Sequence, residues 1–165
     1  MIIPFKSVSI SHRSAPLTIR EMVALNEDES KAFTLKCKDL FGLQELLIVS
    51  TCNRTELYFT TQEDISEQWI KALLIEKGLT NTADYVNYFI QMNETNESLQ
   101  HLFEVATGLQ SKVVGDLQIP NQIKKAYQLA ADHNMAGPYL HRLMHTIFYS
   151  NKRVAQETSF RDGAA

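Results

Sequence analysis

The sequence predicts an α+β protein in which a mixed part is followed by a helical part. Short β-branched and apolar runs, one of them with period-two alternation, lie before residue 93 and are typical of strands. From Asn96 onward the apolar residues recur with a period of 3.6, which is typical of amphipathic helices. We therefore expect a β-α-β-β-α-β part over residues 1–93 and a helical part over residues 94–165.

The first strand is expected at residues 5–11, where Val8 and Ile10 alternate with serines. Two helices should follow, over residues 18–25 and 27–41. Each begins with a capping-box pattern, in which a residue that can accept a backbone hydrogen bond precedes an acidic residue by three positions. These pairs are Thr18 with Glu21 and Asn26 with Glu29.

Four further elements complete the mixed part. Residues 46–49 form a nearly continuous apolar run, as in a strand buried on both faces. Residues 56–61 and 85–92 are expected to be strands, and residues 64–77 carry apolar side chains at helical spacing. The helical part then shows three apolar stripes, the last with Pro138 in its first turn.

Composition narrows the class of protein. The chain has 165 residues, a net charge of −3 and two cysteines, and no apolar run approaches the roughly 18–20 residues that cross a bilayer. The first residues lack the pattern of a secretory signal, so we expect a cytoplasmic protein with free thiols and no membrane partner. The negative net charge does not favour nucleic-acid binding along a broad surface, but it is compatible with a protein that grips only one end of an RNA.

The sharpest local feature is a cysteine in a polar break after an apolar strand, Ser50-Thr51-Cys52-Asn53-Arg54. A cation two residues away favours the reactive thiolate, and an arginine could also clamp a carboxylate through its planar fork. The alternative is a cysteine packed as a small hydrophobe beside a surface charge.

The other candidates carry weaker signals. Cys37 falls on the apolar face of a helix and should lie in the core. His101 lies beside an apolar stripe, where a structural role is the common one. Gly115-Asp116-Leu117-Gln118 precedes a helix and could hold an anion, or Asp116 could simply cap that helix. No spacing predicts a metal site, and no Gly-x-Gly-x-x-Gly is present to hold a dinucleotide.

Four segments together resemble the N-terminal region of glutamyl-tRNA reductase, the first committed enzyme of the five-carbon route to tetrapyrroles such as haem. They are residues 9–16 (SISHRSAP), 49–58 (VSTCNRTELY), 101–111 (HLFEVATGLQS) and 152–158 (KRVAQET). The resemblance spans nearly the whole chain. It implies that residues 1–93 have a ferredoxin-like fold and that NADPH-binding and dimerisation domains lie outside the chain.

The resemblance also implies a reaction. The Cys52 thiolate would attack the ester of glutamyl-tRNA and form a thioester, which NADPH held by another domain would reduce to glutamate-1-semialdehyde. The partners implied are glutamyl-tRNA, a second copy in the complete enzyme (with this chain alone a monomer), and the next enzyme of the pathway, glutamate-1-semialdehyde aminomutase. His101 would share the catalytic role.

Substrate contacts carry over onto the turn and onto a second segment. Arg54 would bind the γ-carboxylate of the glutamyl group, since the α-carboxyl is the ester. The acceptors for the α-amino group would be found among Ser111, Asp116 and Gln118. The substrate-binding set implied by the resemblance is Thr51, Asn53, Arg54, Ser111, Asp116, Leu117, Gln118 and Gln122. The second segment departs from the family's Gly-Glu-Pro-Gln-Ile-Leu-Gly-Gln, reading Gly-Asp-Leu-Gln-Ile-Pro-Asn-Gln over residues 115–122.

Overall fold

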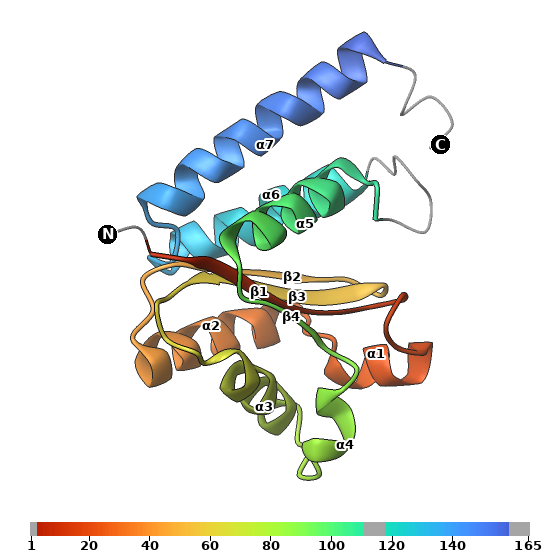
Figure 1. Ribbon diagram of the computed structural model, residues 1–165, viewed down its shortest axis with the longest axis vertical. Helices are drawn as coiled ribbons and strands as arrows, with labels where there is room; N and C mark the ends of the chain where they lie inside the picture. Colours follow the sequence, from red (N-terminus) through yellow and green to blue (C-terminus); the bar gives the residue numbers. More distant parts are fainter. Residues whose placement is uncertain (1–2, 111–117, 159–165) are drawn as a thin grey trace.

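The computed structural model describes residues 3–110 and 118–158 (Figure 1). Its centre is a four-stranded sheet with the strand order β2-β3-β1-β4, in which all three neighbouring pairs are antiparallel. The strands are β1 (Phe5–Ser11), β2 (Leu46–Ser50), β3 (Arg54–Thr60) and β4 (Ile90–Met92). Helices connect β1 to β2 and β3 to β4, so the predicted β-α-β-β-α-β order is confirmed.

Helices cover both faces of this sheet, as Figure 1 shows. One layer contains α1 (Leu17–Val23), α2 (Glu27–Phe41), α3 (Ser66–Glu76) and α4 (Ala83–Val86). The opposite layer contains α5 (Thr95–Thr107), α6 (Gln118–Asp132) and α7 (Pro138–Glu157). The helical part therefore packs directly on the sheet.

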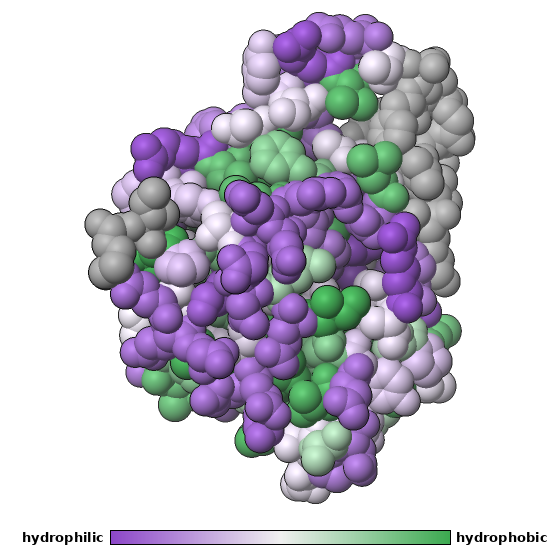
Figure 2. Space-filling model, viewed as in Figure 1, coloured by the Kyte–Doolittle hydropathy of each residue, from purple (hydrophilic) through white to green (hydrophobic). Residues whose placement is uncertain are grey.

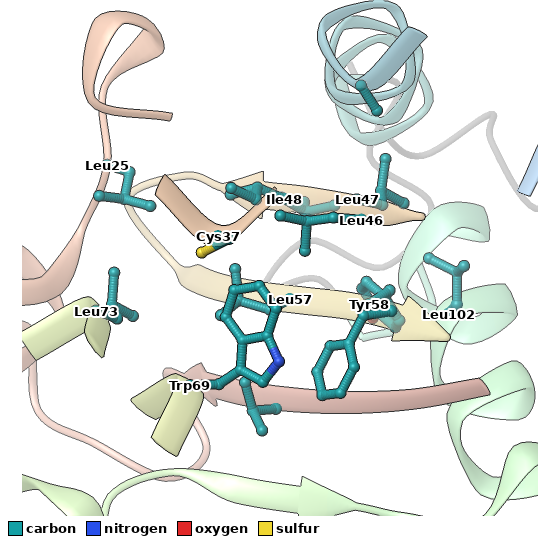
Figure 3. Close-up of a cluster of buried hydrophobic side chains, with 14 of the residues drawn as sticks. Leu25, Cys37, Leu46, Leu47, Ile48, Leu57, Tyr58, Trp69, Leu73 and Leu102 are labelled. Atoms are coloured by element: carbon teal, nitrogen blue, oxygen red, sulfur yellow. The ribbon is translucent and has the colours of Figure 1, made fainter. Parts of the chain in front are cut away.

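The two faces of the sheet differ in chemistry because side chains alternate along a strand. On the face toward α2 and α3, Leu57 and Phe59 of β3 are buried, and the Phe59 ring lies 5.2 Å from the Trp69 ring. Figure 3 shows Trp69, Leu57 and Cys37 in this apolar cluster. Cys37 is fully buried, so the core prediction for it is confirmed.

The face toward α5 is polar and yet buried. The serines of β1 lie opposite Arg54, Glu56 and Tyr58 of β3, and all of these residues are at most 9% exposed. The Ser7 hydroxyl reaches the Ser98 hydroxyl of α5 at 3.3 Å. The sheet thus presents a row of hydrogen-bonding groups to the helical layer.

Long-range polar contacts fix α7 on the rest of the molecule. The Leu140 amide in its first turn donates to the carboxylate of Glu45, the residue before β2, at 2.7 Å, which caps the helix. Buried Asn151 donates to the Ala106 carbonyl of α5 at 3.0 Å. The outer surface on the face shown in Figure 2 is mostly hydrophilic, with apolar residues in small separate patches. Within residues 3–110 and 118–158, no helix is both long enough and apolar enough to span a membrane.

Three sequence predictions need correction. The strand expected over residues 85–92 is shortened to β4, because turn hydrogen bonds between Asn81 and Asp84 place the residues before it in α4. The capping box at Thr18 is wrong, since α1 begins after Pro16 with no side-chain cap. The strand expected from residue 56 begins at Arg54, which places that arginine inside β3. The capping box at Asn26 is confirmed.

Candidate active site

Cys52 lies at the tip of a tight connection between β2 and β3. Ser50 is paired with Thr55 across the hairpin, so few residues make the turn. The Thr51 amide donates to the Arg54 carbonyl at 2.8 Å, and the Asn53 amide donates to the Thr51 hydroxyl at 3.1 Å. Cys52 itself is exposed, which contradicts the alternative that it packs as a small hydrophobe.

Arg54 is buried and held on two sides. It is 3% exposed, its Nη1 donates to Glu56 Oε2 at 3.4 Å, and its Nη2 donates to the Gln110 carbonyl at 2.5 Å. The alternative that Arg54 is a surface charge is therefore wrong. Within the described residues, these contacts use two of the five N–H donors of the guanidinium, and the others remain for a substrate.

Glu56 is the hub of a buried polar network that sequence reasoning missed. Its side chain is completely buried; Tyr58 donates to Oε1 at 2.7 Å and His101 Nε2 donates to Oε2 at 2.6 Å. Arg54, Glu56 and Tyr58 share one face of β3 because they are two residues apart, and His101 reaches them from α5. The contact to Glu56 makes Nε2 the donor atom and leaves Nδ1 for other partners.

This network shifts the pKa values of Glu56 and Tyr58. Burial acts to raise the pKa of Glu56, but the hydrogen bond and charge of His101, together with Arg54 and Tyr58, outweigh it and lower the pKa below its ordinary value of 4.5. Burial, and then the Glu56 charge, raise the pKa of the Tyr58 hydroxyl well above its usual range. The network therefore holds an ionised carboxylate away from water beneath the turn.

The structure brings together part of the predicted site. Thr51, Cys52 and Asn53 form the turn, and Arg54 lies directly behind it. His101 opens on a hollow of about 350 Å³ that Ser11, Arg13, Glu104 and Gln110 also line. Hydrogen bonds from Gln100 and Gln110 lower the pKa of Glu104 there.

The second predicted substrate-binding segment, residues 111–122, lies only partly within the described residues. Ser111, Asp116 and Leu117 lie outside the described residues. Gln118 is the first described residue of α6, and Gln122 lines a different hollow of about 390 Å³ on the β2 side of the sheet, together with Ser50. The buried Gln122 Oε1 has no hydrogen-bond partner among the described residues. Gln122 and His101 thus lie in separate hollows.

Two further residues escaped the sequence analysis. The sequence does contain a signal for Glu56, because a carboxylate two positions after an arginine on a strand lies on the same face of the sheet as that arginine. Arg20 of α1 had none, because only the folded chain brings it to the turn; its Nη1 donates to the Cys52 carbonyl and to Asn53 Oδ1, each at 3.3 Å. Within the described residues no cluster of three or more His, Cys, Asp or Glu side chains could hold a metal ion.

The arrangement suits acyl transfer. An exposed thiol on a fixed turn can act as a nucleophile, and a buried arginine two residues away can hold a planar carboxylate. An imidazole oriented by a buried carboxylate can carry a proton, which is the general logic of nucleophilic triads.

Comparisons with known proteins show the family of the chain. Residues 8–158 match a family described as "Glutamyl-tRNAGlu reductase, N-terminal domain". The chain is 59% identical to a glutamyl-tRNA reductase of Cytophaga hutchinsonii over 165 residues, which are all of this chain and 39% of that protein. It is 35% identical to the glutamyl-tRNA reductase of Rubrobacter xylanophilus, over 94% of this chain and 36% of that one.

A solved structure gives the same result. The fold resembles glutamyl-tRNA reductase from Methanopyrus kandleri with a TM-score of 0.77 and 26% identity, covering 94% of this chain and 35% of that one. The chain therefore spans less than two-fifths of the length of these relatives.

Proposed function

Because this chain belongs to the glutamyl-tRNA reductase family, we propose that it binds glutamyl-tRNA and takes the glutamyl group onto Cys52. The Sγ atom attacks the carbonyl carbon of the ester, a C–S bond forms, and the C–O bond to the terminal ribose breaks. The thiol proton leaves with the ribose oxygen as a hydroxyl. The observation that carries this proposal is an exposed thiol on a fixed turn directly before a buried arginine.

Arg54 selects the substrate in this proposal. Its unused N–H donors bind the γ-carboxylate, because the α-carboxyl of the glutamyl group is the ester itself. The contacts to Glu56 and the Gln110 carbonyl hold the guanidinium plane in place before substrate arrives. Such preorganisation reduces the ordering cost of binding.

His101 moves the proton. Glu56 engages Nε2, so Nδ1 is the atom that can take the thiol proton and return it to the leaving oxygen. The α-amino group is assigned to acceptors among Ser111, Asp116 and Gln118, with Thr51, Asn53, Leu117 and Gln122 completing the substrate site.

The rest of the pathway lies with other domains or proteins. This chain has no Gly-x-Gly-x-x-Gly, and we assign NADPH binding and reduction to glutamate-1-semialdehyde to a domain outside the chain. The complete enzyme would be a cytoplasmic homodimer that hands its product to glutamate-1-semialdehyde aminomutase, whereas this chain alone would be a monomer. We assign a ferredoxin-like fold to residues 1–93, which the strand order β2-β3-β1-β4 supports, and a completing helical part to residues 94–165.

A binding module without chemistry is the second candidate, favoured by the separation of Gln122 from His101. Glutamyl-tRNA labelled in the amino acid distinguishes the two. Acid quenching denatures the complex, so label that stays with the protein has been transferred covalently. Binding to the tRNA with no acid-stable label on the protein would assign the chain to the binding class.

A further inference from the structure

Arg20 is a buried cation whose described side-chain hydrogen bonds both go to the turn that carries Cys52. It is 7% exposed and lies on α1, which Figure 1 places beside the tip of the β2–β3 hairpin. Nη1 donates to the Cys52 carbonyl and to Asn53 Oδ1, each at 3.3 Å. Within residues 3–110 and 118–158 it forms no ion pair with a carboxylate, and its buried Nε has no hydrogen-bond partner.

This placement is costly. A charge removed from water destabilises the fold unless a counterion or several hydrogen bonds replace the solvent. Arg54 has a carboxylate, Glu56, as its counterion, whereas the partners of Arg20 among the described residues are one carbonyl and one amide oxygen of the turn. Stability alone therefore does not explain an arginine at position 20.

The contacts of Arg20 complete the fixation of the turn. The His12 amide donates to the Asn53 carbonyl at 3.0 Å, which attaches the turn to the end of β1. Arg20 holds the Cys52 carbonyl and the Asn53 side chain from α1. The turn just after the thiol-bearing residue is thereby tied to two different elements, α1 and the end of β1.

We propose that Arg20 is a positioning residue that holds the Cys52 turn in the geometry needed for attack on the ester. It acts through the Cys52 carbonyl and the Asn53 side chain of the turn and does not touch the reacting atoms. A guanidinium suits this task because one planar group can donate to two acceptors in fixed directions, which an ammonium on a flexible stem cannot copy. The catalytic part of the inference rests on the proposed function of Cys52.

The test compares Arg20→Ala with Val23→Ala, which loosens the packing of the same helix and leaves the guanidinium in place. Two quantities are measured: hydrogen exchange of the Thr51 and Asn53 amides by NMR, and the rate of acyl transfer from glutamyl-tRNA per folded molecule. Arg20→Ala should speed the exchange and slow the transfer by at least about tenfold each, as expected for the loss of charged hydrogen bonds. Free guanidinium, at concentrations too low to unfold the protein, should partly restore both.

The outcomes separate this proposal from the proposed function. If wild-type protein is not acylated but Arg20→Ala alone loosens the turn, the anchoring role of Arg20 stands and the acyl-transfer function fails. If the turn amides exchange in Arg20→Ala as in wild type, Arg20 does not hold the turn. If Val23→Ala has the same effects and guanidinium restores nothing, Arg20 only supports α1, and the proposal is overturned.

Discussion

Replacing Glu56 by glutamine tests the buried network beneath the turn. The substitution keeps the size of the side chain, and its oxygen can still accept one hydrogen bond from His101 or Tyr58. It removes the negative charge opposite Arg54, which is 3% exposed and has no other carboxylate partner within residues 3–110 and 118–158. Breaking a buried ion pair by removing one partner costs about 3–5 kcal/mol, and the retained hydrogen bond places this case near 3 kcal/mol.

Urea unfolding followed by circular dichroism measures this loss and its pH dependence. The pKa of Glu56 is lowered in the folded state, so its charge stabilises the fold above the ordinary carboxyl pKa of 4.5. That contribution disappears as the pH falls from 4.5 through the lower folded pKa. The difference between wild type and Glu56→Gln should therefore be largest at neutral pH and shrink in acid.

A matched exposed pair provides the control. Arg153 and Glu157 form a salt bridge at 3.0 Å on α7, with both side chains more than half exposed. Glu157→Gln should change the free energy of unfolding by less than about 0.5 kcal/mol. If Glu56→Gln costs no more than this control, or its cost is the same at pH 7 and in acid, then an ionised Glu56 does not support the buried network.

Three other substitutions follow from the structure. Arg54→Lys should slow acyl transfer in single-turnover assays by an amount equal to roughly 2–5 kcal/mol of lost transition-state stabilisation. The reason is that one ammonium cannot donate to Glu56, the Gln110 carbonyl and a substrate carboxylate together. An unchanged rate would refute carboxylate binding by Arg54. Gly42→Ala should destabilise the protein by about 1 kcal/mol, since Gly42 ends α2 at φ +60°, and thermal unfolding checks this. Burial raises the pKa of the Cys37 thiol above its ordinary value of 9.0. The buried neutral thiol therefore stabilises the fold fully below pH 9.0, and this contribution is lost progressively at higher pH, where the thiol of the unfolded chain ionises. The stability difference between wild type and Cys37→Ala should accordingly shrink in alkaline urea titrations, and a constant difference would contradict the burial.

Local signals predicted much of the fold. The Asn26–Glu29 capping box and Gly42 mark the ends of α2 because the groups that satisfy a helix end lie within a few residues of it. The core position of Cys37 followed from helical periodicity for the same reason. The strand expected at residues 85–92 failed because local turn hydrogen bonds around Asn81 competed with β propensity.

The candidate site could be predicted only in part. Cys52 stood out as a cysteine in a polar break, and the structure leaves it exposed. The roles of Glu56 and Arg20 depend on contacts with α5 and with the turn, which no local pattern contains. The serines of β1 are a further case in which a local pattern does not show the tertiary contact. Serines at alternate positions of a strand are typical of a solvated face, but α5 covers this face and the serines are buried.

Mapping the acyl group within the protein tests the central claim most directly. The chain is mixed with glutamyl-tRNA, quenched in acid, digested and analysed by mass spectrometry, with buried Cys37 as the internal comparison for exposed Cys52. We predict a glutamyl group on the Cys52 peptide, none on the Cys37 peptide, and loss of the adduct in Cys52→Ser. A protein that binds glutamyl-tRNA without acquiring the group, or an adduct that persists in Cys52→Ser, would contradict the assignment of Cys52 as the nucleophile.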